Sequence, residues 1–118
     1  MQPDFPPQVT VEQFAHRLQS RDNFIVLDVR EDWEIQRAHI DDTRLEVRPV
    51  SRLAIEGTGG LPREVQSPDA EVYVICHLGT RSADVTAWLA SQGWKKVFSV
   101  SGGIDEYARR IDPSVGRY

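Results

Sequence analysis

Apolar residues near the start of the chain recur every three to four positions, which is the period of an amphipathic helix. Val11, Phe14 and Leu18 fall on one face of such a helix. Thr10 and Gln13 have the spacing of a capping box, so this helix begins after Thr10 and ends near residue 20. Similar arguments predict helices over residues 30–37, 49–55, 81–91 and 104–110.

Three short stretches are almost continuously apolar and rich in β-branched residues. They cover residues 24–29, 72–75 and 97–100, and each is typical of a strand buried on both faces. Residues 38–40 are expected to lead into a further short strand. Residues 56–62 and 66–71 are expected to be loops, and the proline-rich stretch from Pro3 to Pro7 is expected to be an extended lead-in.

Strands alternate with helices along the chain, so we expect the α/β class, with a mainly parallel central sheet and helices on both faces. Ligands of such sheets bind outside the carboxyl ends of the strands. Asp28 and Cys76 both stand at predicted carboxyl ends. The pattern therefore places these two residues on the same rim of the fold.

Composition narrows the class of protein. The chain has 118 residues, for which a single domain over residues 1–118 is expected. Its net charge of −4 argues against a nucleic-acid or membrane-surface partner. One cysteine excludes an intrachain disulfide and a multi-cysteine zinc site, and the three scattered histidines do not suggest a metal site. We find no signal peptide and expect a cytoplasmic protein without cofactor or metal.

The single cysteine begins a segment, residues 76–82, that we call the cysteine loop. Its other members are His77, Leu78, Gly79, Thr80, Arg81 and Ser82. A loop that curls around the sulfur would direct main-chain N–H groups at it, and the following helix and Arg81 would add positive potential. Such surroundings stabilise a thiolate, the nucleophilic form of cysteine. The alternative for Cys76 alone is a small buried apolar residue.

Four motifs in order resemble the rhodanese family of sulfurtransferases. The cysteine loop, CHLGTRS, resembles the family's C-x-x-G-x-R-S active-site loop. The other three are residues 27–31, which resemble a D-V-R-E strand end, Glu34 with residues 38–40, and the G-G turn in residues 100–104. Departures from the pattern are Ile35, Ala38, Asp41-Asp42 and Tyr107.

The resemblance implies a rhodanese-like three-layer fold and a persulfide mechanism. Cys76 would take the outer sulfur of thiosulfate or a persulfide donor and pass it to a thiol or protein acceptor. An alternative is a sulfur-relay module for a partner enzyme. A third alternative is a phosphatase or an arsenate reductase, since related enzymes of those two kinds share this fold. Their loop, however, has the spacing C-x5-R. The C-x4-R spacing from Cys76 to Arg81 gives a smaller ring, which favours sulfur.

Several residues outside the cysteine loop have both a functional and a structural interpretation. The functional interpretation of Asp28 is that it orients the loop or pairs with Arg81. The structural interpretation is that it caps a helix beginning near Arg30. Arg30 lines the site and attracts an anionic donor, or forms a surface salt bridge. Glu34 pairs with Arg81, or is a solvated helix charge. His77 is expected near the substrate rather than as a catalytic group.

Overall fold

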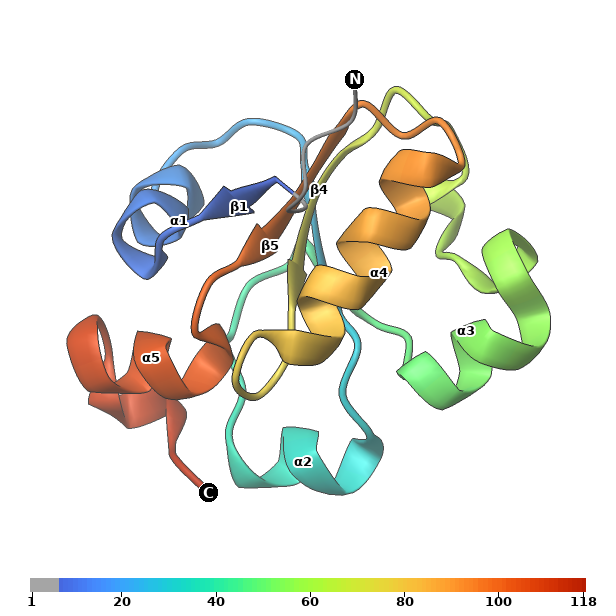
Figure 1. The fold of residues 1–118 in the computed structure, drawn as a ribbon. Coiled ribbons are helices and arrows are strands. Elements are labelled where there is room, and N and C mark those ends of the chain that lie inside the picture. Colours follow the sequence, from blue (N-terminus) through green and yellow to red (C-terminus); the bar gives the residue numbers. More distant parts are fainter. Residues whose placement is uncertain (1–6) are drawn as a thin grey trace.

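A single sheet of five strands forms the centre of the protein, and every neighbouring pair of strands is parallel (Figure 1). The structure is a computed structural model and describes residues 7–118. The strands are β1 (Gln8–Val9), β2 (Ile25–Asp28), β3 (Leu45–Val47), β4 (Glu71–Ile75) and β5 (Lys96–Val100). Their order across the sheet is β1-β5-β4-β2-β3, so the three strands predicted from apolar runs are the three inner ones.

Within residues 7–118 there are five α-helices, of which the first four connect successive strands and the fifth follows the last strand. They are α1 (Val11–Leu18), α2 (Asp32–Arg37), α3 (Val50–Glu56), α4 (Thr80–Ser91) and α5 (Gly103–Arg110). Short 3₁₀ helices cover Gly57–Gly60, Arg63–Val65 and Pro113–Val115. The capping box before α1 is present as predicted, with Thr10 Oγ1 accepting from Gln13 N and Gln13 Oε1 accepting from Thr10 N. No helix within residues 7–118 is long and apolar enough to cross a membrane.

The helices cover both faces of the sheet and bury one apolar core on each (Figure 1). Helices α3 and α4 pack over the face of the sheet that carries Val74, and Leu89 of α4 belongs to the core on this side. Helices α1 and α5 pack over the opposite face, which carries Tyr73, and Phe14 of α1 belongs to the core on that side. Successive residues of β4 therefore point into different cores, which explains why residues 72–75 of this strand are all apolar or aromatic. The predicted α/β class with a parallel sheet is confirmed.

Some local predictions were wrong. Residues 38–40 do not run directly into a strand, because β3 begins only at Leu45. The predicted helix over residues 30–37 is shorter and begins at Asp32, after an N-cap at Glu31. Strand β1 was not predicted. The expected lead-in from Pro3 to Pro7 lies outside the described residues except for Pro7.

The arrangement of the inner strands brings the predicted site residues to one rim. Strands β2 and β4 are neighbours, and their register pairs Asp28 with Ile75. Cys76 follows Ile75 directly, and Arg30 and Glu34 follow Asp28 on the way into and along α2. Figure 1 shows α2 close to the start of α4, where the cysteine loop lies. The rim expected from strand polarity is therefore formed.

Candidate active site

The cysteine loop curls around the sulfur of Cys76. The main-chain N–H groups of Gly79 and Ser82 donate to Sγ at 3.1 and 3.3 Å. Gly79 adopts φ 103°, a left-handed conformation that glycine reaches without steric cost and that brings the chain into the first turn of α4. Two main-chain donors and the N-terminus of α4 therefore direct positive partial charge at this sulfur.

The sulfur lies at the bottom of a small pocket. Cys76 is 1% exposed, and the pocket above it has a volume of about 120 Å³. The lining residues are Cys76, His77, Leu78, Thr80 and Arg81. Leu78 is exposed at the surface, so it forms an apolar part of the pocket mouth. No residue of the segment 41–70 lines this pocket, and that segment does not form a lid over it in this conformation.

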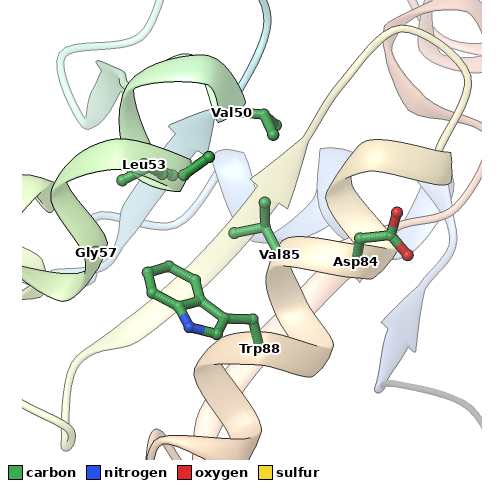
Figure 2. Close-up of a pocket in the computed structure, with 7 residues that line it drawn as sticks. Val50, Leu53, Gly57, Asp84, Val85 and Trp88 are labelled. Atoms are coloured by element: carbon green, nitrogen blue, oxygen red, sulfur yellow. The ribbon is translucent and has the colours of Figure 1, made fainter.

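A larger cleft lies elsewhere, between α3 and α4. Its volume is about 320 Å³, and its apolar lining includes Val50, Leu53 and Trp88. Figure 2 shows Trp88 of α4 facing Leu53 of α3 across this cleft. Asp84 is its one ionisable lining residue, and Cys76 does not line it. The chemistry of the sulfur therefore belongs to the smaller pocket.

The N-terminus of α5 supports the cysteine loop from behind. Ile104 N donates to the main-chain oxygen of Cys76 at 2.9 Å, and Asp105 N donates to that of His77 at 3.1 Å. A Cβ atom at Gly103 would overlap these same two oxygens, so only glycine allows the close approach. The G-G turn thus has a physical role, which is to hold the main chain of the loop in place.

Arg81 and Glu34 form a two-bond ion pair beside the loop. Arg81 Nη1 and Nη2 donate to the two carboxylate oxygens of Glu34 at 2.6 and 2.7 Å. The Glu34 side chain is 4% exposed and that of Arg81 is 36% exposed. The hydrogen bonds from Arg81 lower the pKa of Glu34 to about 2, and the same bonds raise the pKa of Arg81. The pairing interpretation of Glu34 agrees with this geometry.

Arg30 and Asp28 form a second, fully buried pair. Arg30 is 0% exposed, and its Nε and Nη2 donate to the Asp28 carboxylate at 3.0 and 2.8 Å. Asp28 also accepts from Arg30 N at 3.1 Å, but the N-cap of α2 is Glu31, and within residues 7–118 no hydrogen bond or ion pair joins Asp28 to Arg81. Arg30 neither lines the pocket nor forms a surface salt bridge. The sequence missed this pair because it could not show that both residues turn inward.

Tyr118 was not predicted as a site residue, yet it contacts three of the groups above. Its hydroxyl donates to Glu34 Oε2 at 2.8 Å and accepts from Arg30 Nη1 at 3.1 Å. Its ring stacks on the imidazole of His77, with the two ring centroids 3.9 Å apart. His77 Nε2 also donates to the main-chain oxygen of Tyr118 at 3.0 Å. Burial raises the pKa of Tyr118 to about 12, so the phenol is protonated at neutral pH. His77 is therefore held beside the pocket mouth.

Comparisons with known proteins show the family to which this chain belongs. The model of the rhodanese-like domain matches residues 10–110, and the chain belongs to that family. A chloroplastic rhodanese-like/PpiC domain-containing protein of Arabidopsis thaliana is 32% identical over 114 residues, which is 93% of this chain and 36% of that protein. The putative sulfur carrier protein YrkF of Bacillus subtilis is 30% identical over 107 residues, which is 90% of this chain and 53% of that protein.

A solved structure is also similar. The crystal structure of a rhodanese-related protein from Thermoplasma volcanium superposes with a TM-score of 0.71 at 27% identity, covering 89% of this chain and 93% of that one. The rhodanese-like fold expected from the motifs is therefore confirmed. The chain spans only about a third to a half of the length of the two curated relatives above.

Proposed function

We propose that this protein is a sulfurtransferase that carries sulfur as a persulfide on Cys76. The observation that carries the proposal is the pair of main-chain amides, from Gly79 and Ser82, aimed at the Cys76 sulfur. These donors stabilise a thiolate without a histidine base, and thiolate is the form of cysteine that attacks sulfur. Membership of the rhodanese-like family supports the same chemistry.

The proposed reaction has two half-reactions that share one covalent intermediate. In the first, the Cys76 thiolate attacks the outer sulfur of a donor such as thiosulfate. A bond forms between Sγ and that sulfur, the donor's S–S bond breaks, and sulfite leaves with the electron pair. In the second, cyanide or a thiolate acceptor attacks the outer sulfur of the persulfide. The bond to Sγ breaks and Sγ leaves as the thiolate, so the enzyme is regenerated.

A sulfur-relay module is the second candidate, favoured by the similarity to a putative sulfur carrier protein. In that role Cys76 would receive sulfur from a donor enzyme and release it only to a protein partner. A phosphatase or arsenate reductase is less well supported. The C-x4-R loop is one residue shorter than the C-x5-R loop of those enzymes, and a smaller ring fits one sulfur atom better than a tetrahedral oxyanion.

A sulfur-transfer assay separates these candidates. Purified protein is given thiosulfate and cyanide, and thiocyanate is measured beside a Cys76→Ser control. We expect thiocyanate formation that depends on Cys76. Persulfide formation without efficient turnover would favour the relay. Cys76-dependent hydrolysis of a phosphate ester without thiocyanate would overturn the proposal in favour of the phosphatase.

A further inference from the structure

A buried hydroxyl on the central sheet lies behind the cysteine loop. Ser99 is on β5, is 0% exposed and stands between the apolar residues Phe98 and Val100. Its Oγ lies 2.8 Å from Ser82 Oγ, and within residues 7–118 it has no other side-chain hydrogen bond. Ser82 is also 0% exposed, and its Oγ lies 3.4 Å from Cys76 Sγ and 3.1 Å from Gly79 O. The three side chains form a continuous line from the sheet to the sulfur.

Burial fixes the direction of the bond between the two hydroxyls. A buried O–H without an acceptor is destabilising, and among residues 7–118 the only acceptor within hydrogen-bond distance of Ser99 Oγ is Ser82 Oγ. Ser99 therefore donates to Ser82. This leaves the proton of Ser82 free for its other neighbours, Cys76 Sγ and Gly79 O. A sulfur anion attracts that proton more strongly than a neutral carbonyl does, because hydrogen bonds to charged groups are the stronger ones.

We propose that Ser99 is a positioning residue that acts through Ser82 to give the Cys76 sulfur a third hydrogen bond whenever that sulfur carries the negative charge. The first two come from the amides of Gly79 and Ser82. When Cys76 is a thiol, its S–H donates to Ser82 Oγ instead, and Ser82 turns its own proton to Gly79 O. Nothing in the motifs of the sequence marks Ser99 for this role.

The proposal rests on the proposed function for its catalytic consequence, and that consequence differs between the two half-reactions. Sγ carries the charge as the attacking thiolate and again as the leaving group, whereas in the persulfide the charge sits mainly on the outer sulfur. A stabilised thiolate leaves faster but attacks less readily. Loss of the Ser99 hydroxyl should therefore slow the second half-reaction, in which Sγ is the leaving group. In the first half-reaction, a Cys76 thiolate that has formed should attack the donor at the same rate or slightly faster.

The test uses Ser99→Ala, Ser82→Ala, the double variant, and Thr86→Val as a matched control. Thr86 is on α4, is 0% exposed, and its hydroxyl has no partner within residues 7–118. Thr86→Val therefore removes a buried hydroxyl that makes no hydrogen bond to Ser82, Ser99 or Cys76. The pH midpoint of iodoacetamide alkylation of Cys76 is measured for each variant, and urea unfolding verifies that each is folded.

The other charged or titratable groups around the Cys76 pocket are unchanged in all these variants. They are His77 and Arg81 of the loop, Glu34 on α2, Asp105 on α5, Tyr118, and the Asp28–Arg30 pair beside β4. A change in the alkylation midpoint can therefore be assigned to the hydroxyl that was removed.

We expect Ser99→Ala to raise the alkylation midpoint by about half to one pH unit, and Ser82→Ala to raise it by roughly one to two units. In the Ser82→Ala background Ser99→Ala should add nothing. Release of sulfur from the preformed persulfide to cyanide should slow about two- to threefold in Ser99→Ala. Thr86→Val should match the wild type in both measurements.

The proposal would be overturned if Ser99→Ala moved the midpoint no further than Thr86→Val, or if its effect survived in the Ser82→Ala background. If Ser99→Ala does not fold, an unchanged midpoint in Ser82→Ala alone contradicts the proposal, because Ser99 has no other route to the sulfur. Alkylation needs no sulfur donor. A shifted midpoint without any sulfur transfer would therefore count against the proposed function and leave the role of Ser99 supported.

Discussion

Replacement of Glu34 by glutamine tests the ion pair that holds Arg81 beside the pocket. Glutamine has nearly the same shape, so packing is preserved while the negative charge is removed. The carboxylate accepts two hydrogen bonds from Arg81 and one from the Tyr118 hydroxyl, at 2.6, 2.7 and 2.8 Å. The amide group of glutamine would direct N–H bonds at groups that are themselves donors. Glu34→Gln should therefore destabilise the folded protein.

The pKa of Glu34 sets the size of this effect. It is lowered from 4.5 to about 2, a difference that corresponds to about 3 kcal/mol of stability. Arg81 is partly exposed, so solvent screens part of the attraction. We expect Glu34→Gln to lower the free energy of unfolding by about 2 kcal/mol near neutral pH, where breaking a fully buried pair would cost roughly 3–5 kcal/mol.

The pH dependence of the effect has a definite sign. Because folding lowers the pKa of Glu34, its charge stabilises the protein fully above about pH 4.5, and the stabilisation is lost as the pH falls towards 2. Urea unfolding of the wild type and Glu34→Gln should therefore differ most near neutral pH and converge near pH 2. Glu56→Gln is a matched control, because Glu56 pairs with Arg52 on the exposed surface of α3. Its effect should be a few tenths of a kcal/mol.

Two results would refute this reasoning. One is a Glu34→Gln variant no less stable than Glu56→Gln near neutral pH. The other is a difference from the wild type that stays constant as the pH falls from about 4.5 to about 2, since it could not then arise from the charge of Glu34.

Two further substitutions test the support of the cysteine loop. Gly103→Ala places a Cβ atom against the main-chain oxygens of the loop, so it should cost more than 2 kcal/mol and slow alkylation of the cysteine. Gly93→Ala, also at positive φ but with open space around it, should cost only about 1 kcal/mol, and equal losses would contradict the packing argument. Tyr118→Phe removes the bond to Glu34 and should cost about 1 kcal/mol by thermal unfolding. Tyr107→Phe is the control. If Tyr118→Phe were as stable as Tyr107→Phe, the hydrogen bond from the Tyr118 hydroxyl to Glu34 would not stabilise the fold.

The parts that sequence predicted well depend on neighbours along the chain. The three inner strands are buried on both faces, so their sequences are almost continuously apolar and easy to recognise. The cysteine loop is likewise local, because the donors that approach Cys76 come from Gly79 and Ser82, within six residues of it. Strand β1 has two residues and β3 has three, too few to show a period, and neither was placed.

The parts that sequence missed depend on contacts between distant segments. In the sequence, Ser99 is a single serine within a mostly apolar strand, and nothing marks it as functional. Only the packing of α4 on β5 brings its hydroxyl to Ser82. Tyr118 lies far along the chain from Glu34, and no periodicity connects them. Arg30 was interpreted as a surface or pocket cation, whereas its guanidinium turns inward to Asp28 two residues earlier. Such side-chain directions follow from the tertiary fold.

The most direct measurement of the central claim is the intact mass of the protein after treatment with a sulfur donor. Protein incubated with thiosulfate, then freed of excess donor, is analysed by mass spectrometry beside Cys76→Ser. A persulfide on Cys76 predicts a gain of about 32 Da, one sulfur atom, which cyanide removes and which the serine variant lacks. An unchanged mass after treatment with both thiosulfate and a small persulfide donor, or an equal gain in Cys76→Ser, would contradict it.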